Sequence, residues 1–217
     1  MKHFSLTELL NLPSRYRANL INSCAGYKTA NLIATKGENE ICNVAIFNSI
    51  VHIGSNPPML GFILRPTTVP RNTYNNIKET KYFTINQIHK DIIKDAHHTA
   101  AKYDSDISEF DKTDLNEIYL DNFFAPYVEQ SKIKIGCQYI NEYHIKENDT
   151  ILIIGKVEHL YLEMDNVKDD GWVALDKSET VAIVGLDGYA LPQIIERLNY
   201  AKPDVKTTSI LSKQENT

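Results

Sequence analysis

The chain has 217 residues and a mass of 24.7 kDa, with 42% hydrophobic residues, 24% charged residues and a formal net charge of −5. A chain of this size buries roughly 70% of its unfolded surface and needs no disulfide or metal to fold. The acidic balance disfavours nucleic acids and anionic membranes as partners, since both select basic surfaces. No apolar run approaches the length of a membrane-spanning helix.

The N-terminal stretch and the cysteines indicate a cytoplasmic protein. Thr7, Glu8 and Asn11 interrupt the only candidate for the apolar core of a signal peptide, so no signal peptide is expected. Cys24, Cys42 and Cys137 are scattered and odd in number, which predicts reduced thiols rather than a disulfide framework or a zinc site.

The predicted elements begin with a short helix between Ser5, whose spacing from Glu8 fits a capping box, and Pro13. Short apolar segments separated by turn residues then predict strands at Ala18–Ala25, Thr29–Thr35, Ile41–Asn48, Met59–Leu64, Tyr82–Ile88, Ile133–Tyr139 and Thr150–Met164. Helices are predicted over 72–80, 91–102 and 191–198, with Asn72 as a helix cap and Pro192 in a first turn. Residues 103–122 are polar and irregular, and the last dozen residues are expected to fray.

This pattern predicts one mainly β domain, an antiparallel barrel or sandwich with peripheral helices, because strands do not alternate regularly with long helices. Gly37 is expected in a hairpin turn between two apolar runs.

Several common catalytic signatures are absent from the sequence. It has no Rossmann or Walker glycine loop, no nucleophile elbow and no zinc-protease motif. The seven histidines and the acidic run over 104–114 lack metal-ligand spacing, so no metal site is predicted. No catalytic residue can be named, and whether His52, His89 or His97 approaches a ligand stays open.

The stretch 43–73 has the composition of a phosphate site. Polar Asn48 and Ser49 end one strand, Arg65 ends another, and Arg71, Asn72 and Thr73 lead into a helix. Guanidinium groups, short polar side chains and a helix start suit a phosphate dianion. Two surface arginines and an ordinary capped helix explain the same residues without a ligand.

Motifs within and around this stretch resemble the flavin reductase-like family. The resemblance covers about residues 18–164, in the family's order. It consists of Asn43-Val44-Ala45 with Phe47-Asn48-Ser49, Asn56-Pro57-Pro58, Gly61-Phe62, Arg65-Pro66, Arg71-Asn72-Thr73, Phe83-Thr84-Ile85-Asn86, Glu109-Phe110, Ala125-Pro126 and Gly155-Lys156-Val157. Asn48 departs from the family, where many members have a hydroxyl residue.

This resemblance implies an FMN-binding split β-barrel that forms a homodimer with FMN near the interface. The core would span about 18–165, with a C-terminal extension over 166–217. The cofactor-binding residues carried over by position are Thr35, Asn43, Ala45, Phe47, Asn48, Ser49, Arg65, Arg71, Asn72 and Thr73. The implied activity is an NAD(P)H-dependent flavin reductase, with hydride transfer to flavin N5 and an oxygenase or another acceptor as electron partner.

Three alternatives stay open from the sequence. One is a non-catalytic FMN-binding electron carrier, and another is a flavoprotein like pyridoxamine-phosphate oxidase. The third is a barrel that binds an oligonucleotide or a protein without any cofactor, which the acidic charge disfavours for nucleic acid.

Overall fold

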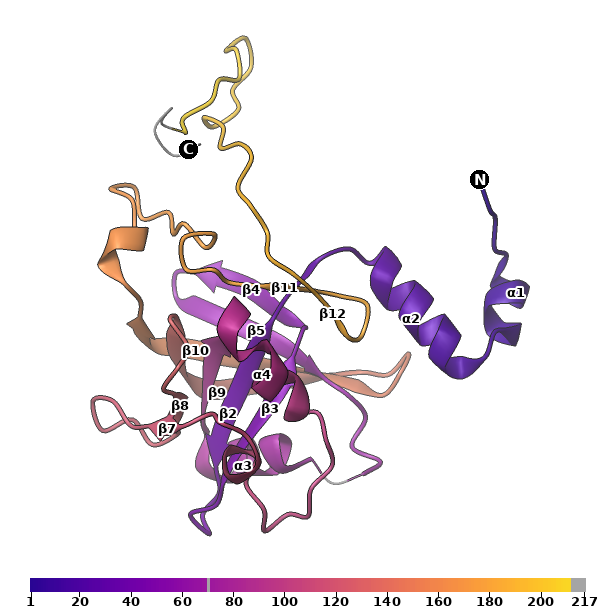
Figure 1. Cartoon of the computed structure of the whole chain (residues 1–217), viewed down its shortest axis with the longest axis vertical. Helices are drawn as coiled ribbons and strands as arrows, with labels where there is room; N and C mark the ends of the chain where they lie inside the picture. The colour runs from indigo at the N-terminus through magenta and orange to yellow at the C-terminus, as the bar shows by residue number, and fades with distance from the viewer. Residues whose placement is uncertain (70, 212–217) are drawn as a thin grey trace.

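The computed structural model describes residues 1–69 and 71–211, and its centre is one large antiparallel sheet (Figure 1). Seven strands run in the order β3-β2-β6-β9-β10-β5-β4. They are β2 Asn31–Lys36, β3 Cys42–Phe47, β4 Ile50–Ser55, β5 Pro58–Leu64, β6 Tyr82–Gln87, β9 Lys134–Ile145 and β10 Thr150–Tyr161. The prediction of a mainly β, antiparallel fold with peripheral helices is therefore confirmed.

Smaller elements complete the fold. β1 Lys28–Thr29, β11 Ala182–Val184 and β12 Gly188–Ala190 form a three-stranded sheet, and β7 Glu117–Ile118 pairs with β8 Tyr127–Val128. The helices are α1 Leu6–Asn11, α2 Ser14–Cys24, α3 Asn72–Thr80 and α4 Ile93–His98, with the 3-10 turns η1 Lys90–Ile92, η2 Glu109–Lys112 and η3 Met164–Asn166. Within the described ranges, no helix combines the length and apolarity that crossing a membrane requires.

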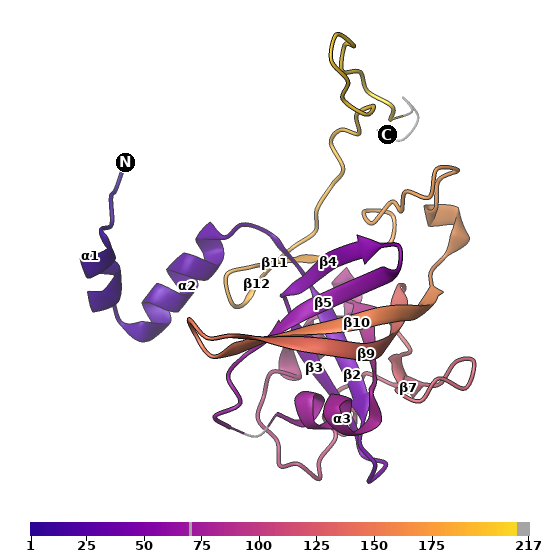
Figure 2. The ribbon, with the colours of Figure 1, turned by 180° about the vertical axis from the view of Figure 1, so that it is seen from behind.

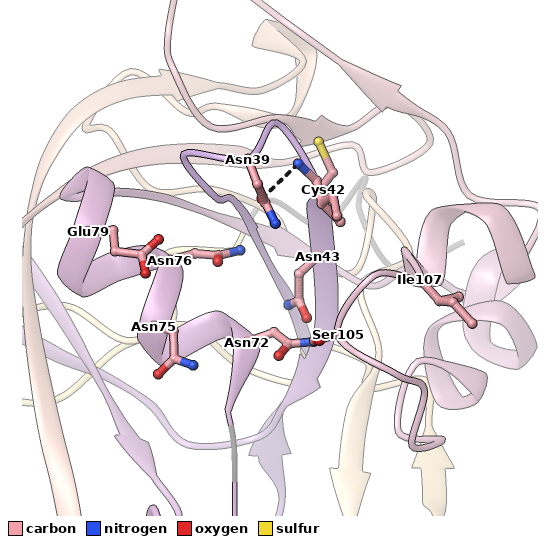
Figure 3. Close-up of a pocket in the computed structure, with 10 residues that line it drawn as sticks. Asn39, Cys42, Asn43, Asn72, Asn75, Asn76, Glu79, Ser105 and Ile107 are labelled. Atoms are coloured by element: carbon pink, nitrogen blue, oxygen red, sulfur yellow. Dashed lines mark hydrogen bonds between the residues drawn. The ribbon is translucent and has the colours of Figure 1, made fainter.

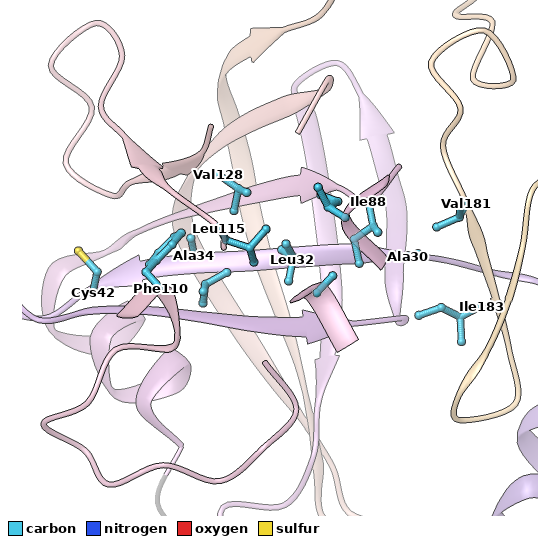
Figure 4. Packing of buried hydrophobic residues seen from close by; sticks show 13 residues of the cluster. Ala30, Leu32, Ala34, Cys42, Ile88, Phe110, Leu115, Val128, Val181 and Ile183 are labelled. Atoms are coloured by element: carbon cyan, nitrogen blue, oxygen red, sulfur yellow. The ribbon is translucent and has the colours of Figure 1, made fainter. Parts of the chain in front are cut away.

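The central sheet is covered on both faces by different apolar clusters. One cluster joins Leu32 and Val44 of the sheet to Phe110, Val128 and Ile183 from later segments (Figure 4). The second lies inside the curled sheet, where residues such as Phe62, Phe83 and Ile153 pack together. Ile77 of α3 is fully buried in this inner cluster, so close packing fixes α3 against the strands that it contacts.

The N-terminal region contains a confirmed helix and a wrong strand. Ser5 caps α1, and Glu8 returns a bond to the Ser5 backbone, as the capping box predicts. The segment Ala18–Ala25 was predicted as a strand but belongs to α2. Its apolar residues Leu20 and Ile21 do not alternate with polar ones, and it pairs with no strand.

Other differences arise where local pattern and tertiary contacts disagree. β4 was not predicted, because this edge strand is exposed on both faces and shows no alternation. The helix predicted over 91–102 is limited to η1 and α4, and the helix predicted over 191–198 is wrong, because that segment is extended. β9 continues to Ile145, beyond the predicted Tyr139. The last dozen residues were expected to fray, and of these residues 212–217 lie outside the described residues.

Candidate functional site

A polar cavity of about 160 Å³ lies between α3, the β2–β3 hairpin and the loop that follows α4 (Figure 3). Its walls are lined by Asn39, Ile41, Cys42, Asn43, Asn72, Asn75, Asn76, Glu79, Ser105 and Ile107. Five of these ten side chains are asparagine amides, which both donate and accept hydrogen bonds. The cavity therefore suits a ligand with many oxygen atoms rather than an apolar one.

Helical spacing explains how α3 supplies four of the lining residues. Asn72, Asn75, Asn76 and Glu79 stand at positions i, i+3, i+4 and i+7, so they share one face. The helix buries Thr73 and Ile77 against the protein. This spacing was visible in the sequence and would have found Asn75, Asn76 and Glu79, which the prediction missed.

Two hydrogen bonds fix α3 onto the paired strands. Asn43 Nδ2 donates to Thr73 Oγ1 at 3.0 Å, and Asn76 Nδ2 donates to Thr35 Oγ1 at 3.0 Å. Thr35 and Asn43 are partners in the β2–β3 register, and both are buried. Four of the predicted site residues, Thr35, Asn43, Asn72 and Thr73, are thus brought together at the cavity.

The first turn of α3 leaves backbone donors without a side-chain cap. Arg71, and not the predicted Asn72, occupies the N-cap position, and it makes no side-chain cap bond. The first backbone amides of a helix have no partner within the helix and attract anions. Arg71 directs Nε and Nη2 to the carbonyl oxygen of Pro66, each at 3.4 Å, so the guanidinium group lies beside this helix start.

The remaining predicted residues lie outside the cavity wall. Ala45 and Phe47 follow Asn43 at alternate positions of β3, and Phe47 packs edge-on against Phe62 with ring centroids 5.1 Å apart. Ser49 donates to the carbonyl oxygen of Ile63 at 3.0 Å and accepts from its amide at 3.2 Å. Asn48 is half-buried between β3 and β4, and Arg65 is exposed after β5.

Two buried groups that can ionise are Cys42, which lines the cavity, and Glu109, which bonds Val44 next to the lining residue Asn43. Burial raises the pKa of the Cys42 thiol to about 12, and its sulfur lies 3.3 Å from the Tyr119 hydroxyl oxygen. The thiol therefore stays protonated at neutral pH and is a poor nucleophile. Glu109 is buried and accepts the amide hydrogen of Val44 at 3.1 Å, which satisfies a donor on the edge strand β3.

The three histidines that were left open do not line the cavity. His89 Nε2 lies 3.0 Å from the Gln130 carbonyl oxygen, His97 Nδ1 lies 2.9 Å from the Tyr189 hydroxyl oxygen, and His52 is exposed on β4. Among residues 1–69 and 71–211, no three metal-ligating side chains cluster as a metal site would require.

The sequence and the antiparallel barrel both match a known family. Residues 26–178 match the model of the flavin reductase like domain. The crystal structure of a candidate flavin reductase with a split barrel domain from Shewanella frigidimarina is 40% identical, with a TM-score of 0.90 over 93% of this chain and 100% of that chain. The chain therefore belongs to the flavin reductase-like family, and the predicted split-barrel fold is confirmed.

Two more distant structures share the fold. Nitrilotriacetate monooxygenase component B from Bacillus cereus has a TM-score of 0.79 at 16% identity, over 91% of this chain and 98% of that chain. Flavoredoxin of Desulfovibrio vulgaris (Miyazaki F) has a TM-score of 0.69 at 20% identity, over 94% of this chain and 98% of that chain. Family membership, together with the Shewanella frigidimarina structure, supports a flavin-binding oxidoreductase.

Proposed function

We propose that the chain binds FMN and acts as an NAD(P)H-dependent flavin reductase, in the form of a homodimer with FMN near the interface. The observation that carries this proposal is the asparagine-lined cavity beside the uncapped first turn of α3. When bound, the flavin ring would accept hydride from NAD(P)H at N5 and pass electrons to free flavin, an oxygenase or another acceptor.

The residues at the cavity fit the polar part of FMN. The amides of the first α3 turn and the Arg71 guanidinium group would hold the phosphate, through charge-assisted hydrogen bonds. Asn43, Asn72 and Asn76 would donate to and accept from the hydroxyl groups of the ribityl chain.

The size of the cavity limits what one chain can enclose. Its volume of about 160 Å³ lies below the roughly 300 Å³ at which pockets begin to bury a drug-sized ligand. The cavity therefore has room for the phosphate and ribityl groups, and the ring would lie outside it, against a surface that includes β3.

The lining residues also limit the chemistry. Cys42 stays protonated, which disfavours a thiol redox step, and Glu79 is the single carboxylate in the wall. Hydride transfer needs no side-chain acid or base, so the protein has to position the reactants and exclude water. An oxygenase partner is supported by the name of the Bacillus cereus neighbour, component B of a monooxygenase.

Flavin titration with anaerobic reduction tests the proposal. The fluorescence of FMN should be quenched on binding. FMN should bind at least about tenfold more tightly than riboflavin, which lacks the phosphate. NADH or NADPH should then bleach the bound flavin without oxygen. Binding without bleaching would identify a non-catalytic electron carrier, whereas equal affinity for FMN and riboflavin would contradict the phosphate site.

A further inference from the structure

The chain exposes more surface than a compact protein of its mass. Its accessible surface is 13499 Å², whereas a compact monomer of this mass exposes roughly 10,100 Å². The excess is roughly 3,400 Å². Two segments leave the body of the protein (Figures 1 and 2). We call residues 1–25 the N-terminal arm and residues 191–211 the C-terminal arm.

The N-terminal arm contains helices that have almost nothing to pack against. α1 and α2 have six and eleven residues and bury no side chain, and Leu6 and Leu10 are 71% and 63% exposed. Helices this short are marginal in water unless an apolar face is covered. The Arg17 guanidinium group bonds the Leu10 and Leu12 carbonyl oxygens, which ties α2 to α1. An exposed ion pair of Arg15 with Asp187, at 3.7 Å, links α2 to the turn between β11 and β12.

The C-terminal arm exposes apolar side chains to a similar degree. Ile195 and Tyr200 are 88% and 85% exposed, although both are large. Within residues 191–211, Arg197 joins the arm to the body: it pairs with Asp170, and its guanidinium carbon lies 4.6 Å from the centre of the Trp172 ring. Such a segment does not gain enough from its own chain to offset the entropy of ordering it.

The body presents an apolar sheet face that could receive these arms. Phe62 and Ile153 are buried on the inner face of β5 and β10, and their neighbours Ile63 and Leu152, which pair with each other, lie on the opposite face. The register continues this outer face to Tyr143 of β9, the partner of Leu152, and to Val51 of β4, the partner of Gly61. Val51 and Tyr143 are 40% and 58% exposed on it. In Figure 2 these strands face the viewer without another described element in front of them. We call this surface the open face.

We propose that both arms of one chain pack against a second copy of the chain, with the open face as part of the surface that receives them. The surface available fits a homodimer, since obligate dimers bury roughly 1,000–2,500 Å² on each partner. Charge also fits a second copy. The N-terminal arm has three basic residues, Lys2, Arg15 and Arg17, against one acidic residue, Glu8, whereas the whole chain has a net charge of −5.

This inference rests on the homodimer of the proposed function but not on flavin, so it is tested in flavin-free protein. Sedimentation equilibrium of the full chain should give a dimer. Ile21→Glu, Tyr200→Glu and Val51→Glu should each raise the dimer dissociation constant at least roughly 30-fold, as loss of an interface hot spot does. Met164→Glu is the matched control, because Met164 is 74% exposed outside the arms and the open face, and it should leave the dimer intact.

Amide hydrogen exchange provides a second readout on the same proteins. α1 and α2 should be protected in the dimer and should lose protection in the monomeric variants, while the β6 and β9 amides stay protected in both. A wild-type monomer would overturn the inference, including a monomer whose arms are protected by folding back on their own barrel. A dimer that resists the two arm substitutions would overturn it as well.

Discussion

At the scale of single residues, the phosphate assignment depends on one guanidinium group. Arg71 is half-buried and lies beside the uncapped α3 turn, whereas Arg65 is exposed. Arg71→Ala should weaken FMN binding at least about tenfold, about 1.4 kcal/mol, because charge-assisted bonds to the phosphate are lost. Riboflavin affinity should not change. Fluorescence titration checks both ligands, and Lys112→Ala is the control, because Lys112 is exposed and lies outside the arms, the cavity wall and the open face. Equal losses for both flavins would remove Arg71 from the phosphate site.

Glu109 allows a prediction about pH and stability. Burial raises the pKa of this carboxyl group more than its backbone hydrogen bonds, including the one from Val44, lower it. A carboxyl group with a raised pKa in the folded state favours folding most when protonated, and that contribution is lost as pH rises from the unfolded pKa through the folded one. Glu109→Gln should therefore keep or raise stability at pH 7 and flatten its dependence on pH in the acidic range.

A second substitution separates charge from hydrogen bonding at Glu109. Leucine cannot accept the Val44 amide hydrogen, so Glu109→Leu should cost about 1–3 kcal/mol, as expected for an unpaired buried donor. Urea unfolding of the two variants between pH 4 and pH 8, a range set roughly around the ordinary carboxyl pKa, makes the comparison. If glutamine destabilises as much as leucine, the carboxylate charge is needed and the pKa argument is wrong.

At the scale of elements, the local sequence pattern predicted the strands that are buried on at least one face of the sheet. β2, β3, β5, β6 and β10 were found because their apolar residues reflect burial in the sheet. The failures share a cause. α2, β4 and the segment 191–198 are largely exposed in one chain, so burial does not impose a pattern on them.

The site was predictable to the extent that short motifs carry it. Asn43, Asn72 and Thr73 stood in the motif shared with the family and do meet at the cavity. Asn39 and Ser105 come from a turn and a distant loop, and their approach to α3 depends on the tertiary fold, which local spacing does not encode. Whether the other predicted residues touch FMN stays a prediction.

Glycine in β10 gives a prediction about how the strands pack. A Cβ at Gly155 would lie 2.5 Å from Phe83 Cζ, next to a register shift between β9 and β10. Gly155→Ala should destabilise the protein by about 1–3 kcal/mol through overpacking. At Gly54 in β4 the nearest atom to such a Cβ is the Pro57 oxygen at 3.8 Å, so Gly54→Ala is the matched control. Equal unfolding midpoints for the two variants would contradict the close packing of β10 on β6.

At the scale of the whole molecule, the small cavity and the exposed arms both indicate that a second copy of the chain contributes surface. One chain encloses a volume of about 160 Å³ for a ligand yet exposes 13499 Å² of surface. In the proposed homodimer, a second copy would cover the arms and would also provide the surface on which the flavin ring rests. Flavin binding and dimerisation would then be coupled equilibria.

Thermodynamic linkage makes this coupling measurable in both directions. If each ring contacts both copies, saturating FMN should tighten the dimer at least about fivefold. Because a symmetric dimer holds two FMN molecules, dimerisation must then tighten FMN binding at each site by the square root of that factor, about 2.2-fold. Sedimentation with and without FMN gives the first factor. FMN titrations of wild-type dimer and of the Ile21→Glu monomer give the second, since Ile21 lies on α2 and outside the cavity wall. Two factors equal to one would place the ring on a single chain, and the arms would then serve association alone.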